Sequence, residues 1–355
     1  MHNFSPLIKL SIGRTGGSFT SLLLAGAASL ALSGPAHATL TIDPTFDSSI
    51  TSLPSATAIE GAINSAIGAV EGAITSPHNI TVSIDFQNMS SGLGESSTAV
   101  GELTYYQYYN AFKAVATQPN QLAALASLGP APSSNSSPNP VNGSAFVQVT
   151  APEARNLGFS ASPSGFDSII GLNTSITSPP NGGLSGNYGL QAVANHEIDE
   201  ALGIGGDGST IDSNLFGNNA VGDLDLYRYS APGTRSYSDV QTTSPFSYFS
   251  INGGTTVLSY FNQTSGADYG DWLSNPIPTG FSPQVQDAFG EPGTNPALGT
   301  NEITAFNAIG YDVLSPVPAP LIGLGLPVFL AVGGLLFGAK LLERSRRGAG
   351  LFDVA

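Results

Sequence analysis

The residues best suited to chemistry lie together in the stretch 188–203, which reads YGLQAVANHEIDEALG. His196 and Glu200 are four positions apart, so they would share one face of a helix, with Glu197 one step round it. This is the H-E-x-x-H pattern with a glutamate in its last place. In the parent pattern two histidines bind zinc and the intervening glutamate activates a water. A carboxylate in the last place can still bind a metal, although its shorter reach changes the geometry.

The same stretch reads as the helix that would position these groups. It contains no proline, its apolar residues fall largely on one side, and Gly203 supplies a C-terminal cap. A helix this rich in carboxylates is also typical of a solvent-exposed acidic face, and the motif alone does not separate the two interpretations. His78 and His196 are the only histidines between residues 39 and 320, which favours a specific role for His196.

The composition indicates a chain of many turns and short strands rather than a helical bundle. Of 355 residues, 41% are hydrophobic and 10% are charged, while glycine (43) and proline (25) are abundant. The length suits one large domain or two modest ones. The absence of cysteine excludes disulfides and any thiolate metal site.

Charge is distributed unevenly along the chain. Between residues 39 and 320, four basic residues oppose 23 Asp and Glu, a formal balance of 4 − 23 = −19 with histidine neutral. A surface this acidic repels nucleic acid and anionic lipid, so we expect no nucleic-acid partner. It suits an extracellular protein, and it suits cations.

Residues 1–38 are typical of a secretory signal peptide. Lys9 and Arg14 form the basic region, residues 19–33 form the apolar region, and AHA at 36–38 is the small-residue cleavage pattern. The chain would therefore engage the export machinery. An N-terminal anchor helix is the alternative.

The body of the chain alternates helical and strand patterns, an α+β order. Isoleucine and valine recur every three or four residues over 55–76, which predicts a helix, and ITVSIDF at 80–86 alternates as a half-buried strand does. We also expect a helix-rich region at 103–128, strands at 144–150 and 166–172, and a short helix at 152–157. A glycine-rich turn at 181–186 would lead into the helix that carries His196.

The stretch that follows this helix, GIGGDGSTIDSN, is rich in glycine and aspartate. Asp207, Ser209 and Asp212 could together bind Ca²⁺. Their spacing does not match the twelve-residue calcium loop, which favours a plain turn.

A second chemically rich stretch is DLDLYRYSAPG at 223–233. It brings two carboxylates, two tyrosines and an arginine into eleven positions, so a third metal ligand from this segment is chemically sensible. Tyr227 or Tyr229 could donate a hydrogen bond to a developing oxyanion. The alternative is an edge strand with solvent-facing charges.

Together, HEIDEALG and DLYRYSAPG resemble a family of secreted bacterial metalloproteases related to the zincins. The likeness continues through YFSIN, GADYGDW and EITAFNAIGYD, and covers roughly residues 80–312. It implies that His196 and Glu200 are metal ligands, that Glu197 is the catalytic base, and that Asp225 is the third ligand. It also implies a zincin-like α+β domain over residues 39–314, with a mixed sheet and an active-site helix.

The chain departs from well-studied zincins in two ways. Metzincins carry a third ligand soon after the helix and a downstream methionine turn, but residue 206 is glycine here and the only methionines, Met1 and Met89, lie upstream. One imidazole with two carboxylates is also a harder donor set than zinc sites usually use. Zn²⁺ is therefore the first expectation, with Mn²⁺ or Fe²⁺ conceivable.

The C-terminal region indicates a membrane or sorting segment. SPVPAP at 315–320 is a proline-rich linker, residues 321–342 begin with nineteen uncharged positions, and residues 343–355 are a basic tail that would stay in the cytoplasm. The arrangement resembles PEP-CTERM sorting signals, which implies a sorting transpeptidase as partner. A permanent membrane anchor through this helix is the alternative.

These observations predict an exported, surface-associated, metal-dependent peptidase that acts on protein or peptide substrates. Glu197 would deprotonate a metal-bound water, and Tyr227 or Arg228 would stabilise the oxyanion. The alternative is a non-catalytic cell-surface or matrix protein on a degenerate zincin-like fold, which the glutamate at position 200 favours.

Overall fold

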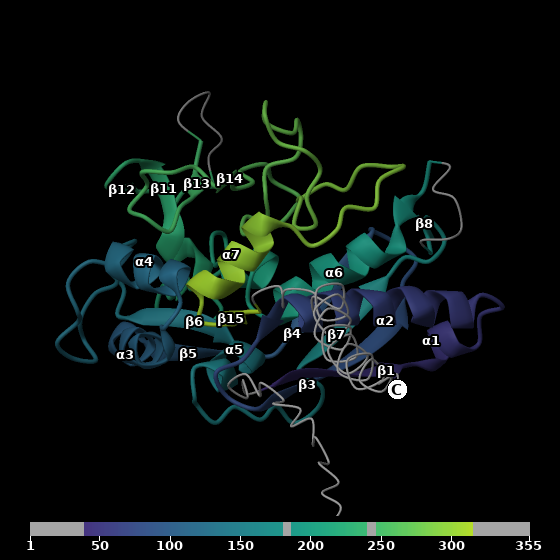
Figure 1. The fold of residues 1–355 in the computed structure, drawn as a ribbon, viewed down its shortest axis with the longest axis horizontal. Helices are drawn as coiled ribbons and strands as arrows, with labels where there is room; N and C mark the ends of the chain where they lie inside the picture. Colours follow the sequence, from purple (N-terminus) through teal and green to yellow (C-terminus); the bar gives the residue numbers. More distant parts are fainter. Residues whose placement is uncertain (1–38, 180–185, 240–245, 315–355) are drawn as a thin grey trace, which may run out of the picture. The chain divides into compact units, whose positions relative to one another are not determined.

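The computed structural model describes residues 39–179, 186–239 and 246–314 (Figure 1). The expected signal peptide, the proline-rich linker, the C-terminal helix and the basic tail lie outside the described residues, as does most of the 181–186 turn. Among the helices that are described, none has the length and apolar character needed to cross a membrane.

The largest sheet is mixed. Its strands are ordered β1 (Leu40–Phe46), β3 (Ile80–Asn88), β7 (Ser168–Leu172) and β4 (Gly94–Thr98). The first three are parallel to one another, and β4 runs antiparallel to β7 at the end of the sheet. Strand β3 confirms the alternation expected at 80–86, because the side chains of Val82, Ile84 and Phe86 are fully buried.

Two helices pack on this sheet and on each other (Figure 1). Helix α2 (Ala56–Ala73) contacts β1, and helix α6 (Leu190–Ala201) contacts β4 and β7. The apolar stripe of α2 is buried at Ile59, Ile63 and Ile67, as its spacing predicts. Asn195 donates a hydrogen bond across the helix pair to the Ala66 carbonyl at 3.0 Å.

A second sheet has the order β10 (Val221–Gly222), β6 (Phe146–Thr150) and β5 (Val100–Thr104). Three helices follow its strands: α3 (Tyr105–Val115), α4 (Pro119–Ser127) and α5 (Ala151–Asn156). Helix α3 begins with a capping box between Thr104 and Gln107, and its aromatic cluster is core, with Tyr108 and Phe112 fully buried.

The C-terminal part of the body is built from short strands and long loops. Its sheet has the order β12 (Thr234–Arg235), β11 (Arg228–Ala231), β13 (Tyr248–Phe249) and β14 (Ser259–Tyr260). The buried Trp272 holds the following loop to this sheet, because its ring packs on Phe249 and Phe261 and its Nε1 donates to Glu302 at 3.0 Å. The Glu302 side chain belongs to α7 (Thr300–Ala308).

The remaining elements are short connections. These are α1 (Ser48–Thr51), β2 (Ile74–Thr75) paired with β15 (Asp312–Val313), β8 (Thr177–Ser178) paired with β9 (Tyr188–Gly189), and the 3₁₀ turns η1 (Gly205–Gly208) and η2 (Leu224–Tyr227). The described chain is therefore α+β with mixed sheets, as expected.

Candidate metal centre

Helix α6 carries the candidate residues, and segments far along the chain fix both of its ends. It begins at Leu190 rather than at 188, because the two preceding residues form β9. Asn295 caps its first turn, accepting a hydrogen bond from the Ala192 N–H at 3.0 Å. Gly203 ends the helical stretch with φ +109°, where a Cβ would lie 3.0 Å from Glu153 Oε2.

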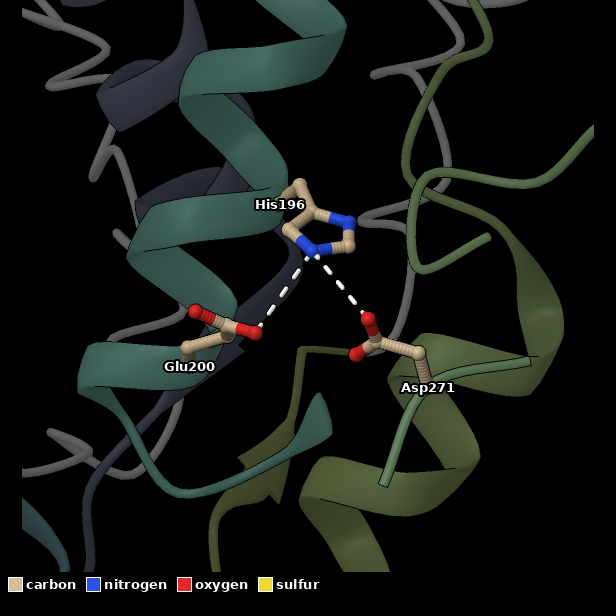
Figure 2. A group of neighbouring side chains, drawn as sticks. All are labelled: His196, Glu200 and Asp271. Atoms are coloured by element: carbon tan, nitrogen blue, oxygen red, sulfur yellow. Dashed lines mark ion pairs between the residues drawn. The ribbon is translucent and has the colours of Figure 1, made fainter. Parts of the chain in front are cut away.

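His196, Glu200 and Asp271 form a compact group at one face of α6 (Figure 2). The Nε2 atom of His196 lies 3.5 Å from Glu200 Oε1 and 3.6 Å from Asp271 Oδ2. Each residue offers one ligand atom, and these three atoms lie within 4.8 Å of one another. Glu200 and Asp271 are buried and His196 is half-buried, so the group could hold a metal ion.

A hydrogen bond fixes which ring nitrogen of His196 faces the carboxylates. Its Nδ1 lies 2.9 Å from the Val285 carbonyl oxygen, which can only accept, so Nδ1 carries a proton. In the neutral ring, Nε2 then presents its lone pair to Glu200 and Asp271, as it would to a metal.

The electrostatics of the group fit a cation. Burial alone would lower the pKa of His196, but the Asp271 charge and the hydrogen bond and charge of Glu200 outweigh it and raise this pKa well above its usual value. Two carboxylates aimed at one nitrogen therefore attract either a proton or a metal ion. A bound metal cation would take the place of the proton on His196 Nε2.

Hydrogen bonds hold both carboxylates in place. Glu200 accepts hydrogen bonds from the Gly206 N–H at 3.0 Å and from the Ser96 hydroxyl, on β4, at 2.7 Å. Asp271 accepts from the Gln286 amide at 3.0 Å. Such partners fix ligand orientation before any ion arrives.

Glu197 lies beside the group and is not a member of it. Its side chain is 4% exposed, and its Oε2 atom has no hydrogen-bond partner among the described residues. Burial, followed by the charge of Glu200, raises its pKa well above the usual value. It packs so closely on β4 that a Cβ at Gly94 would lie 2.1 Å from Glu197 Oε1.

The structure does not bring Asp225, the expected third ligand, into this group. Asp225 is fully buried: one oxygen accepts from Arg228 Nε at 3.1 Å and from Ser209, and the other accepts from backbone amides that include Thr210 N at 2.9 Å. Because both of its oxygens accept hydrogen bonds from the protein, Asp225 stabilises the fold and is not free to bind a metal. Asp271 occupies the place beside His196 instead.

The two residues expected to stabilise an oxyanion are also buried elsewhere. Arg228 stacks on the Phe261 ring at 3.8 Å and pairs with Asp225, and its side chain has no exposed surface. Tyr227 is fully buried, and neither residue lines the cleft at the metal group. Of the residues in the calcium hypothesis, Asp207 and Ser209 line the cleft at the metal group, whereas Asp212 lines a second pocket.

Sequence reasoning therefore identified two of the three residues of the group and missed Asp271. The signal was present in GADYGDW, a segment within the family likeness that places Asp271 directly before the only tryptophan of the sequence. The buried Trp272 fixes Asp271 in space: Trp272 N–H donates to the Gln286 carbonyl at 2.8 Å.

The group opens into a cleft of about 970 Å³. Its walls are β4, the face of α6 that carries His196, and the segment 283–291, with apolar surface from Leu93, Tyr188 and Phe289. No protein-family model, curated protein or solved structure matches the chain. The residues and their geometry therefore carry the functional argument alone.

Proposed function

We propose that this protein is an exported metal-dependent peptidase whose centre consists of His196, Glu200, Asp271 and Glu197. The observation that carries the proposal is the arrangement on α6. A three-residue group that could hold a metal faces a cleft, and a buried carboxylate with an unbonded oxygen stands beside it.

The donor set fits a catalytic rather than a structural metal. Catalytic sites use three protein ligands and leave a position for water, and this group offers one nitrogen and two carboxylate oxygens. A bound Zn²⁺ would polarise a carbonyl and lower the pKa of its water. With two oxygen donors, Mn²⁺ or Fe²⁺ are the alternatives to Zn²⁺.

The protein residues supply positioning and proton transfer. The Val285 carbonyl orients His196, and Ser96 and Gly206 orient Glu200. Burial and the Glu200 charge raise the pKa of Glu197, and the positive charge of a bound metal would lower it again, so that the ionised carboxylate could accept a proton from the attacking water. Its Oε2, which has no partner among the described residues, would be the acceptor for that proton.

The edge strand favours a peptide substrate over a small molecule. Strand β4 pairs with β7 on one side and, among the described strands, with none on the other, while residues 94–98 line the cleft. An extended chain could hydrogen-bond along that free edge as an added strand. The Ser96 hydroxyl, bound to Glu200, places this strand directly at the metal group.

The likeness to zincin-like metalloproteases and the two terminal segments extend the proposal. A mixed sheet with an active-site helix agrees with the expected zincin-like domain. The signal at 1–38 would direct export, and the segment 321–342 would tether the body to the membrane until a sorting transpeptidase removed it. The protein would then act at the cell surface or outside the cell.

The test is a comparison of the full chain with its Glu197→Gln variant. The wild type should cleave a peptide library in a chelator-sensitive way, whereas the variant should keep its metal and lose cleavage, because Glu197 is not a ligand. Mass spectrometry of the peptide products measures cleavage by each protein, and elemental analysis measures the metal that each protein contains. Equal cleavage by the two proteins would exclude Glu197 as base, and no cleavage by either would favour the non-catalytic surface protein.

A further inference from the structure

Among the described residues, the cleft at the metal group is lined by eight carboxyl groups and by no Lys or Arg side chain. Three of these groups, on Glu197, Glu200 and Asp271, already have a role in the proposed function. Binding one metal ion does not explain the charge of the other five, which belong to Glu95, Asp207, Asp268, Asp287 and Glu291.

Two of the remaining carboxylates lie on the Glu200 side. Gly206 separates Glu200 from Asp268: a Cβ at residue 206 would lie 2.4 Å from Glu200 Oε1 and 3.1 Å from Asp268 Cγ. Asp268 is exposed at the rim. Asp207 is half-buried, and its Oδ2 has no hydrogen-bond partner among the described residues.

Two more lie on the segment that orients His196. Asp287 is 7% exposed and accepts a hydrogen bond from the Gln284 N–H at 2.9 Å, and Glu291 is exposed four residues on. Burial raises the pKa of Asp207 and of Asp287 to about 7.

Two other buried carboxylates each face a guanidinium. Asp225 is paired with Arg228 at 3.1 Å, and Asp167 is paired with Arg155 at 2.8 Å. The carboxylates of the cleft have no such partner, because no Lys or Arg among the described residues lines it. A ligand that carries positive charge would supply the missing counter-charge.

We propose that the cleft selects cationic peptides, with Lys or Arg side chains reaching Asp207 and Asp268 on one side of the metal group and Asp287 and Glu291 on the other. This inference rests on the proposed peptidase function, because it needs an extended chain in the cleft. The negative charge of the cleft would then attract a cationic peptide from a distance and favour it over neutral or acidic peptides.

Binding is measured first, without turnover. The full chain carrying Glu197→Gln is titrated with three labelled peptides of equal length, in which the same positions hold Lys, Gln or Glu, and anisotropy is followed at rising salt. The Lys peptide should bind about tenfold more tightly than the Gln peptide, the Glu peptide should bind least, and salt should compress the differences.

Charge removal locates the effect. Adding Asp268→Asn and Glu291→Gln should weaken binding of the Lys peptide about tenfold and leave the Gln peptide unchanged. Asp43→Asn with Asp239→Asn is the matched control, since both residues are exposed and neither lines the cleft. This control should bind all three peptides like the parent protein.

Three outcomes have distinct meanings. Equal binding of the three peptides would overturn the inference. A second metal equivalent that Asp268→Asn removes would also overturn it, because those carboxylates would then serve an ion. A preference for the Lys peptide in a wild-type chain that binds no metal and cleaves nothing would support cationic selection while refuting the proposed peptidase.

Discussion

At the scale of single residues, the hydrogen bond between His196 and the Val285 carbonyl decides what the ring can do. It places the proton on Nδ1 and leaves Nε2 facing two carboxylates at 3.5 and 3.6 Å. Asp271 and Asp225 show the opposite uses of one residue type. Asp271 faces Nε2 of His196, whereas Asp225 neutralises a buried guanidinium.

The first prediction separates these two aspartates. Asp271→Asn should weaken metal binding by at least about 100-fold with a small change in stability, because it removes a ligand. Asp225→Asn should instead lower the free energy of unfolding by about 3–5 kcal/mol, because Arg228 stays buried without its counter-charge. Chelator competition measures the first effect and urea denaturation the second. The reverse pattern would restore Asp225 as the ligand.

The site residues that are close together in the sequence could be predicted, and the distant one could not. His196, Glu197 and Glu200 lie within one helical turn or so, and local spacing is enough to place them on neighbouring faces. Asp271 reaches them through a loop with little regular structure, held by the burial of Trp272. No periodic pattern encodes that contact, and the family resemblance pointed to Asp225 instead.

At the scale of elements, the site depends on how closely β4 approaches α6. Gly94 lets the strand lie against Glu197, and Ser96 then reaches Glu200. Helix α6 and the buried strand β3 were predictable from the periodicity of their apolar residues. The start of α6 was not, because the pairing of Tyr188 with Thr177 is non-local.

The second prediction tests the close contact between Gly94 on β4 and Glu197 on α6. Gly94→Ala would place a Cβ 2.1 Å from Glu197 Oε1, so the base must move; kcat should fall about 100-fold while the metal is retained. Gly101→Ala is the matched control, because it lies in strand β5 with open space around the new methyl group. Steady-state kinetics and metal content are compared. Unchanged turnover in Gly94→Ala would show that Glu197 is not held by this contact.

At the scale of the whole molecule, a second buried acidic pair affects stability. Glu153 and Asp223 are fully buried, on α5 and beside η2, and both Glu153 oxygens lack a hydrogen-bond partner among the described residues. Burial raises the pKa of Asp223 to about 8; burial and the Asp223 charge raise the pKa of Glu153 well above its usual value. The buried tyrosines Tyr108 and Tyr227 face the same pair and add no positive charge.

The third prediction follows from the sign of these shifts. The folded protein keeps a proton on the pair that the unfolded chain releases near pH 4, so stability should fall as pH rises from about 4 to about 8. Glu153→Gln removes one titrating group and should make the fall shallower. Urea denaturation midpoints across this range measure it. A wild-type stability that rises with pH between 5 and 8 would contradict the account.

The α+β class was also predictable at this scale, because alternating patterns and turn-forming residues recur along the body. The division into several small sheets was not, since strands such as β10 and β13 are two residues long and carry no pattern. Their pairing depends on long loops fixed by buried aromatic side chains.

We propose that His196, Glu200 and Asp271 hold one metal ion. Elemental analysis of the purified full chain, grown with zinc, manganese and iron supplied, measures that ion. We expect about one divalent ion per wild-type chain, none in His196→Ala, and one in Asp225→Asn protein that remains folded. A wild-type chain that contains no metal, or a His196→Ala chain that keeps it, would contradict the account.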